Sequence, residues 1–123
     1  MVELNFTQIK NLLSIINDPI EKLEAVIDIG KNLLPPPETA VCNDISGCAS
    51  FVQICRDGNN FYGKADSAIV RGIVAILLSA VDGKTPDEIK KIPLDKMFGD
   101  LNINIGAARL NGVNSMIRFF KNL

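Results

Sequence analysis

Apolar residues recur at every third or fourth position through the first third of the chain, a spacing that places them on one face of a helix. The first stripe consists of Phe6, Ile9, Leu13 and Ile16. The second stripe consists of Ile20, Leu23, Ile27 and Leu34. Asp18-Pro19 separates the stripes and Pro35-Pro36-Pro37 ends the second, because proline interrupts helical hydrogen bonding. This part of the sequence predicts a helical hairpin.

After the prolines the pattern changes to short stretches of β-forming residues. Residues 50–56 are typical of a strand, residues 57–60 have the composition of a turn, and Phe61-Tyr62 begins the next stretch. We predict a β-hairpin here, with a further strand around Ala40-Val41.

Three more helices are expected in the second half. Residues 68–81 are almost wholly apolar, with Asp66 or Ser67 able to cap their start, and a capping box at residues 85–88 predicts a short helix after them. The last helix has an apolar face made of Leu110, Val113, Ile117 and Phe120. The predicted order is α-α-β-β-α-α-α. Because hairpin-linked strands are antiparallel, the fold class is α+β, a small antiparallel sheet packed against helices in a single domain of residues 1–123.

Composition excludes two classes of partner. The chain has 13 basic and 14 acidic residues, and it contains no run of basic residues of the kind that binds nucleic acid. The longest apolar stretch, residues 68–81, is shorter than the roughly 20 residues that cross a bilayer. The N-terminus lacks the basic and apolar regions of a secretory signal, so we expect no membrane partner and a cytoplasmic location.

Cysteine is the residue type that can carry chemistry here, because histidine is absent. The spacing Cys42-x5-Cys48-x6-Cys55 lacks the close cysteine pair of a zinc site, so no metal site is predicted. Cys42 and Cys55 are interpreted as small buried hydrophobic residues rather than disulfide partners. Cys48 follows Gly47 in a polar segment that is expected to be a loop, where a thiol can reach a partner.

Four segments, in order, resemble motifs of the SufE-like sulfur acceptors. Residues 45–52, Ile-Ser-Gly-Cys-Ala-Ser-Phe-Val, are similar to the segment around the family's conserved cysteine. Residues 66–72, 85–89 and 109–113 resemble its D-x-A-I-V-K-G, T-P-x-E/D-I and R-x-N/Q-G-L motifs. The resemblance implies the fold shared with IscU-type scaffolds, and it extends over nearly the whole chain.

The resemblance also implies a function. Cys48 would take persulfide sulfur from a PLP-dependent cysteine desulfurase of the SufS type, stimulate that enzyme, and pass the sulfur to a SufB-containing iron–sulfur cluster scaffold. No bound cofactor is implied, and a homodimer is left open. The chain would be a sulfur-transfer accessory protein with a catalytic-type cysteine, and the sequence leaves open whether it counts as an enzyme. Two departures, Gln53 for a usual tryptophan and Asn104 for a frequent histidine, bear on the choice of partner.

Three residues are expected to support Cys48. Sulfur transfer needs a thiolate, and Arg109, near the start of the last helix, is the cation that could stabilise it. Asp66 is either an N-cap or, as the resemblance implies, a residue that affects the desulfurase or holds the cysteine loop. Gly47 gives that loop its flexibility. We also predict that apolar neighbours such as Ile45 or Phe51 shield Cys48 in the isolated protein.

Two other functions remain open at this point. One is an IscU- or SufU-type scaffold that assembles a cluster on three cysteines. The other is a non-catalytic module that docks on a desulfurase without carrying sulfur.

Overall fold

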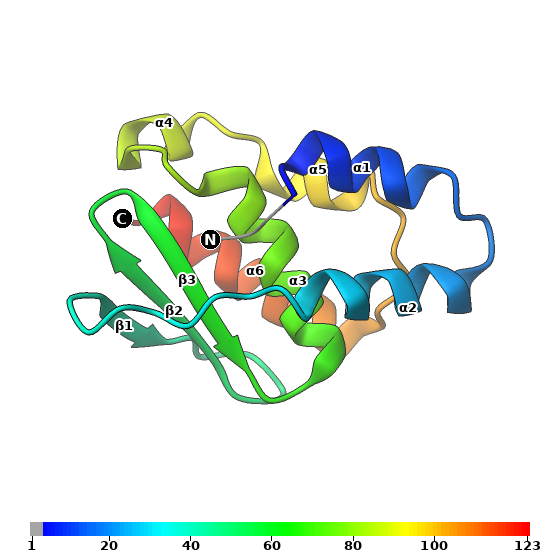
Figure 1. Cartoon of the computed structure of the whole chain (residues 1–123), viewed down its shortest axis with the longest axis horizontal. Coiled ribbons are helices and arrows are strands. Elements are labelled where there is room, and N and C mark those ends of the chain that lie inside the picture. The colour runs from blue at the N-terminus through cyan, green and yellow to red at the C-terminus, as the bar shows by residue number, and fades with distance from the viewer. Residues whose placement is uncertain (1–3) are drawn as a thin grey trace.

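A computed structural model describes residues 4–123 and has α+β architecture, as predicted (Figure 1). The elements are α1 (Phe6–Ser14), α2 (Pro19–Gly30), β1 (Val41–Asp44), β2 (Val52–Asp57), β3 (Asn60–Ala65), α3 (Ala68–Val81), α4 (Pro86–Lys90), α5 (Leu94–Gly99) and α6 (Ala107–Lys121). The predicted order α-α-β-β-α-α-α did not count β1, although a further strand was predicted around Ala40-Val41. It also did not include α5.

Capping residues explain where the helices of the first third begin. Asn5 and the side chain of Gln8 form a reciprocal capping box at the start of α1, and Asp18 accepts hydrogen bonds from the first amides of α2. Helix α2 ends at Gly30, earlier than the predicted stripe, which ran to Leu34. Glycine is a poor helix former, and Pro35 disfavours helical geometry in the residue before it. Residues 31–40 therefore leave the helix and run across the molecule (Figure 1).

The sheet has three antiparallel strands in the order β1-β2-β3. Alternate residues of β2 and β3 are buried, among them Val52, Ile54, Phe61 and Ala65, which is the period expected when one face of a sheet is covered. Helix α3 packs against β3 on one side and against α2 on the other. The core therefore lies around α3.

Helix α3 has the predicted bounds and is the most deeply buried element. Its N-cap is Ser67, whose side chain accepts a hydrogen bond from the amide of Val70. The alternative that Asp66 caps this helix is therefore wrong. Within residues 4–123, no helix combines the length and the apolar character that crossing a membrane requires.

Cys42 and Cys55 are joined by a disulfide, which overturns their interpretation as separate buried hydrophobic residues. Their positions on β1 and β2 are directly opposite in the strand register, and their Cα atoms lie 3.9 Å apart. The spacing of the cysteines does not reveal this pairing, because it depends on which residues the two strands place side by side. Cys48 is left as the free cysteine.

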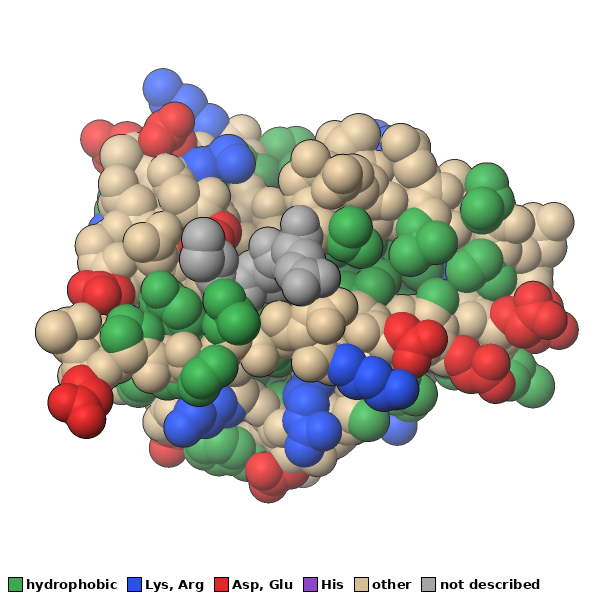
Figure 2. Space-filling view, viewed as in Figure 1, with side chains coloured by type: hydrophobic (Ala, Val, Ile, Leu, Met, Phe, Trp, Pro, Cys, Tyr) green, Lys and Arg blue, Asp and Glu red, His purple; other side chains and the backbone are tan. Residues whose placement is uncertain are grey.

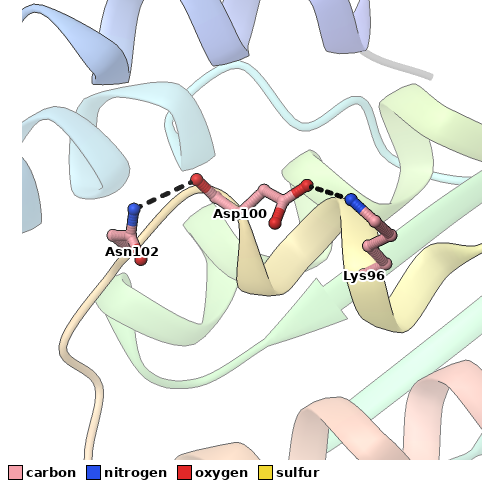
Figure 3. A network of polar contacts seen from close by, with 3 residues as sticks. All are labelled: Lys96, Asp100 and Asn102. Atoms are coloured by element: carbon pink, nitrogen blue, oxygen red, sulfur yellow. Dashed lines mark hydrogen bonds and ion pairs between the residues drawn. The ribbon is translucent and has the colours of Figure 1, made fainter.

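A short polar network joins α5 to the start of the loop that leads to α6 (Figure 3). The Lys96 ammonium lies 3.1 Å from the Asp100 carboxylate, and the Asn102 amide donates to the Asp100 carbonyl oxygen at 3.3 Å. Lys22 of α2 donates to the carbonyl oxygen of Leu101, also in this loop, at 3.2 Å. These contacts connect α2 to the segment that sets where α6 begins.

Candidate functional site

Cys48 lies in the loop that connects β1 to β2, and this loop packs against α6. Gly47 has a φ of +87°, a conformation that side chains with a Cβ rarely adopt. A Cβ added at Gly47 would stand 2.4 Å from the Ser115 hydroxyl oxygen of α6. Ser115 is itself held by Arg118, which donates a hydrogen bond to its oxygen at 3.0 Å. Glycine is therefore required both by the backbone of this loop and by its contact with α6.

Gly112 makes room for the sulfur of Cys48 on the surface of α6. A Cβ added at Gly112 would lie 3.2 Å from the Cys48 sulfur, and the thiol is 3.8 Å from the Gly112 carbonyl oxygen. The glycine of the Arg-Leu-Asn-Gly-Val segment is thus the point where the helix and the cysteine loop meet. The sequence offered only a general expectation of close packing at this position.

A pocket of about 210 Å³ opens beside the thiol. Three segments line it, contributing Cys48, Ala49 and Ser50 from the loop, Ser67, Val70 and Ile73 from the start of α3, and Arg109, Gly112 and Met116 from α6. Cys48 is partly buried and packs against the core. The apolar walls of its pocket come from α3 and α6, whereas the sequence suggested Ile45 or Phe51.

The electrostatics of the pocket favour the neutral thiol in this conformation. Burial raises the pKa of the Cys48 thiol above its ordinary value. Arg109 stands on the first turn of α6 and lines the same pocket, and its guanidinium donates to the Ile105 carbonyl oxygen at 3.3 Å. The fold brings Arg109 and Cys48 to one pocket, but desolvation is the influence that moves the pKa.

Asp66 lies beside the pocket rather than in its wall. Its amide donates to the Phe51 carbonyl oxygen at 3.3 Å, which joins the end of the cysteine loop to the start of α3. Asp66 is exposed and lines a second hollow, separate from the Cys48 pocket. Of the four residues singled out in the sequence, Cys48, Gly47 and Arg109 thus gather at one place, and Asp66 contacts the loop through its backbone.

Ser115 and Met116 of α6 were not anticipated. The signal that could have found them is helical spacing, because residues three and four positions after Gly112 lie on the same face of a helix. Among residues 4–123, no group of three His, Cys, Asp or Glu side chains is placed to hold a metal ion.

Comparison with known proteins identifies the family. Residues 7–123 match the SufE family, described as the Fe-S metabolism associated domain. The chain therefore belongs to the SufE family. It is 35% identical over 113 residues to an uncharacterized SufE-like protein of Rhizobium meliloti, with 82% of this chain and 81% of the relative covered. It is 32% identical over 105 residues to the sulfur acceptor protein CsdE of Escherichia coli, with 78% of this chain and 71% of CsdE covered.

A solved structure shares the fold. The solution structure of a hypothetical protein from Thermus thermophilus superposes with a TM-score of 0.68, covering 99% of this chain and 94% of the other. The two sequences are only 16% identical, so this likeness concerns the fold alone.

Proposed function

We propose that this chain is a sulfur carrier, which accepts persulfide sulfur on Cys48 from a PLP-dependent cysteine desulfurase and passes it to a SufB-containing cluster scaffold. The observation that carries the proposal is the free thiol of Cys48 in its own small pocket, next to Arg109. Membership in a family that includes the sulfur acceptor CsdE supports it. The expected setting is the cytoplasm.

The transfer itself is a thiol–persulfide exchange. The Cys48 thiol loses its proton, and the thiolate attacks the outer sulfur of the donor's cysteine persulfide. A bond forms between the Cys48 sulfur and that outer sulfur while the donor's sulfur–sulfur bond breaks. The donor cysteine leaves as a thiolate and can take up the released proton, so the exchange needs no added oxidant or reductant.

The raised pKa of Cys48 means that the resting protein holds little of the attacking thiolate at neutral pH. Arg109 is exposed and lines the same pocket, so it is the cation that can supply positive charge to the sulfur. In our proposal, docking of the donor excludes water from the pocket, and Arg109 then stabilises the anion more strongly than it can in water.

The disulfide favours a carrier over a cluster scaffold. A scaffold of the IscU or SufU type would use three cysteines, but here Cys42 and Cys55 are bonded to each other. While that bond is closed, the remaining thiol can hold a persulfide but cannot complete a three-cysteine ligand set.

The test is to incubate the chain with cysteine and a cysteine desulfurase and then measure its intact mass without reductant. Wild type is expected to gain the mass of one sulfur atom, and Cys48→Ser is expected to gain none. The matched control is the double variant Cys42→Ser/Cys55→Ser, which should still gain sulfur. Equal gain by wild type and Cys48→Ser would refute the proposal. A Cys48→Ser chain that still stimulates the desulfurase would instead indicate a docking module.

A further inference from the structure

A second hollow, which we call the basic groove, lies next to the Cys48 pocket and has a volume of about 530 Å³. Residues 31–35, the end of β3 and the start of α3 form its walls. We define the groove by Lys31, Lys64 and Arg71, which supply positive charge, and by Leu34 and Phe51, which supply apolar surface. The elements that form it face the viewer in Figure 1, and Figure 2 shows Lys and Arg side chains gathered at the lower edge of the same face with apolar side chains among them.

The basic groove and the Cys48 pocket are lined by residues that adjoin along the chain. Ser50 and Ser67 line the pocket. Their neighbours in the chain, Phe51 and Asp66, line the groove. The Asp66 amide donates a hydrogen bond to the Phe51 carbonyl oxygen, so these two groove residues are joined to each other beside the pocket residues Ser50 and Ser67. A protein that covers the opening of the Cys48 pocket is therefore close to residues of the groove.

The groove has the composition of a protein contact surface. Phe51 is 41% exposed and Leu34 is 48% exposed, and because both line the same hollow they form neighbouring apolar surface of the kind that protein contacts use. A specific protein interface covers about 800 Å² on each partner, far more than the mouth of the Cys48 pocket. A protein that docks over Cys48 must also cover the surface around it, and the groove is part of that surface.

The charge of the groove indicates the chemistry of its occupant. It contains three cations and one acidic residue, Asp66, although the chain as a whole has a net charge of -1. Within residues 4–123, neither Lys64 nor Arg71 pairs with a carboxylate, since the guanidinium of Arg71 donates to the carbonyl oxygens of Ala65 and Asp66. Lys31 forms an exposed ion pair with Asp28.

We propose that the basic groove binds an acidic segment of the sulfur-donating desulfurase, with an apolar side chain of that segment packed between Leu34 and Phe51. The proposal rests on the proposed function, because it takes the donor to be a cysteine desulfurase. Complementary charge would accelerate docking and fix its orientation, which aligns the donor's persulfide with Cys48.

The test measures docking separately from sulfur transfer. Each variant is made in a Cys48→Ser background, which carries no sulfur, and its dissociation constant for the cysteine desulfurase is measured by calorimetry. Lys64→Glu/Arg71→Glu is expected to weaken binding about tenfold or more, because like charges then face each other across the interface. Phe51→Ala should weaken binding by removing the apolar contact. Lys64→Glu alone serves as the variant with the least risk to folding, because Lys64 is exposed.

The matched control is Lys90→Glu, a charge reversal at an exposed lysine on α4, at the other end of the molecule (Figure 1). It should change the dissociation constant by less than about twofold. Binding by the parent should also weaken as salt is raised, and the Lys64→Glu/Arg71→Glu variant should lose most of that dependence.

Failure of this inference is distinguishable from failure of the proposed function. If wild type gains sulfur but the groove variants bind the desulfurase as tightly as Lys90→Glu does, the groove is not the docking surface and the carrier role stands. If the groove variants lose binding but wild type gains no sulfur, the docking surface stands and the carrier role fails. Self-association that Lys64→Glu abolishes would identify a second copy of the chain as the occupant and overturn the proposal.

Discussion

At the scale of single residues, the reactivity of Cys48 depends on its burial. The thiol lies against Gly112 with its pKa raised by desolvation, and alkylation requires the thiolate. With the disulfide intact, Cys48 is the free thiol. The rate of reaction of Cys48 with iodoacetamide can be measured between about pH 7 and 11 in the folded chain and in the chain unfolded in urea. The pH at which the rate reaches half its maximum should be higher for the folded chain. A midpoint at or below the unfolded value would contradict the burial described here.

The same shift has a defined effect on stability. A thiol whose pKa is higher in the folded chain keeps its proton longer there, so folding binds a proton in the interval between the two pKa values. The contribution of Cys48 to stability is present below the unfolded pKa and is lost as pH rises through the folded one.

Gly47 permits a prediction with a matched control. Gly47→Ala combines an unfavourable positive φ with the contact to Ser115, whereas Gly58→Ala has a positive φ but nothing within 4 Å of the added Cβ. In urea unfolding, the positive φ should lower the free energy of unfolding of both alanine variants by about 1–3 kcal/mol. The contact with Ser115 should lower it further in Gly47→Ala but not in Gly58→Ala. Adding Ser115→Ala to Gly47→Ala should recover part of that further loss, because it removes the hydroxyl that the added Cβ meets and leaves a good helix former in α6. Equal losses for the two alanine variants would mean that the loop is not fixed against α6.

At the scale of elements, the disulfide joins the two strands on either side of the cysteine loop. Its cysteines are 13 positions apart, and a closed loop of this size stabilises a folded chain by about 3 kcal/mol in the chain-entropy account. Reductant should therefore lower the unfolding midpoint of wild type and of Cys48→Ser. Reductant should not change the unfolding midpoint of the control variant Cys42→Ser/Cys55→Ser. If reductant has no effect on the midpoint of wild type, the bond does not form in solution. In a reducing cytoplasm this bond would be subject to opening.

The sequence predicted some elements more accurately than others, for physical reasons. The bounds of α3 follow from a long apolar run with a capping residue at its start, and α4 follows from the capping box at Thr85 and Glu88. Helix α5 has six residues, begins after Pro93, and lacks a side-chain cap, so no local pattern marks it. The β1 strand is exposed along its length and has no buried alternation to reveal it.

At the scale of the whole molecule, the cysteine site could be predicted in its parts but not in its assembly. Motif order linked Cys48 to Arg109, and the structure places both on one pocket. The disulfide and the Gly47–Ser115 contact needed the tertiary fold, because strand register and helix docking bring together residues that are distant in sequence. The basic groove is likewise assembled from three separate segments, none of which carries a basic run.

The covalent ring closed by Cys42 and Cys55 contains Cys48, and no lysine or arginine interrupts it. Trypsin cleaves after those two residue types, so residues 32–56 leave the digested protein as one peptide that carries all three cysteines. The mass of this peptide records two events at once: loss of two hydrogens when the ring is closed, and addition of sulfur when Cys48 is loaded. A single spectrum therefore shows whether loaded and unloaded chains differ in the state of the ring.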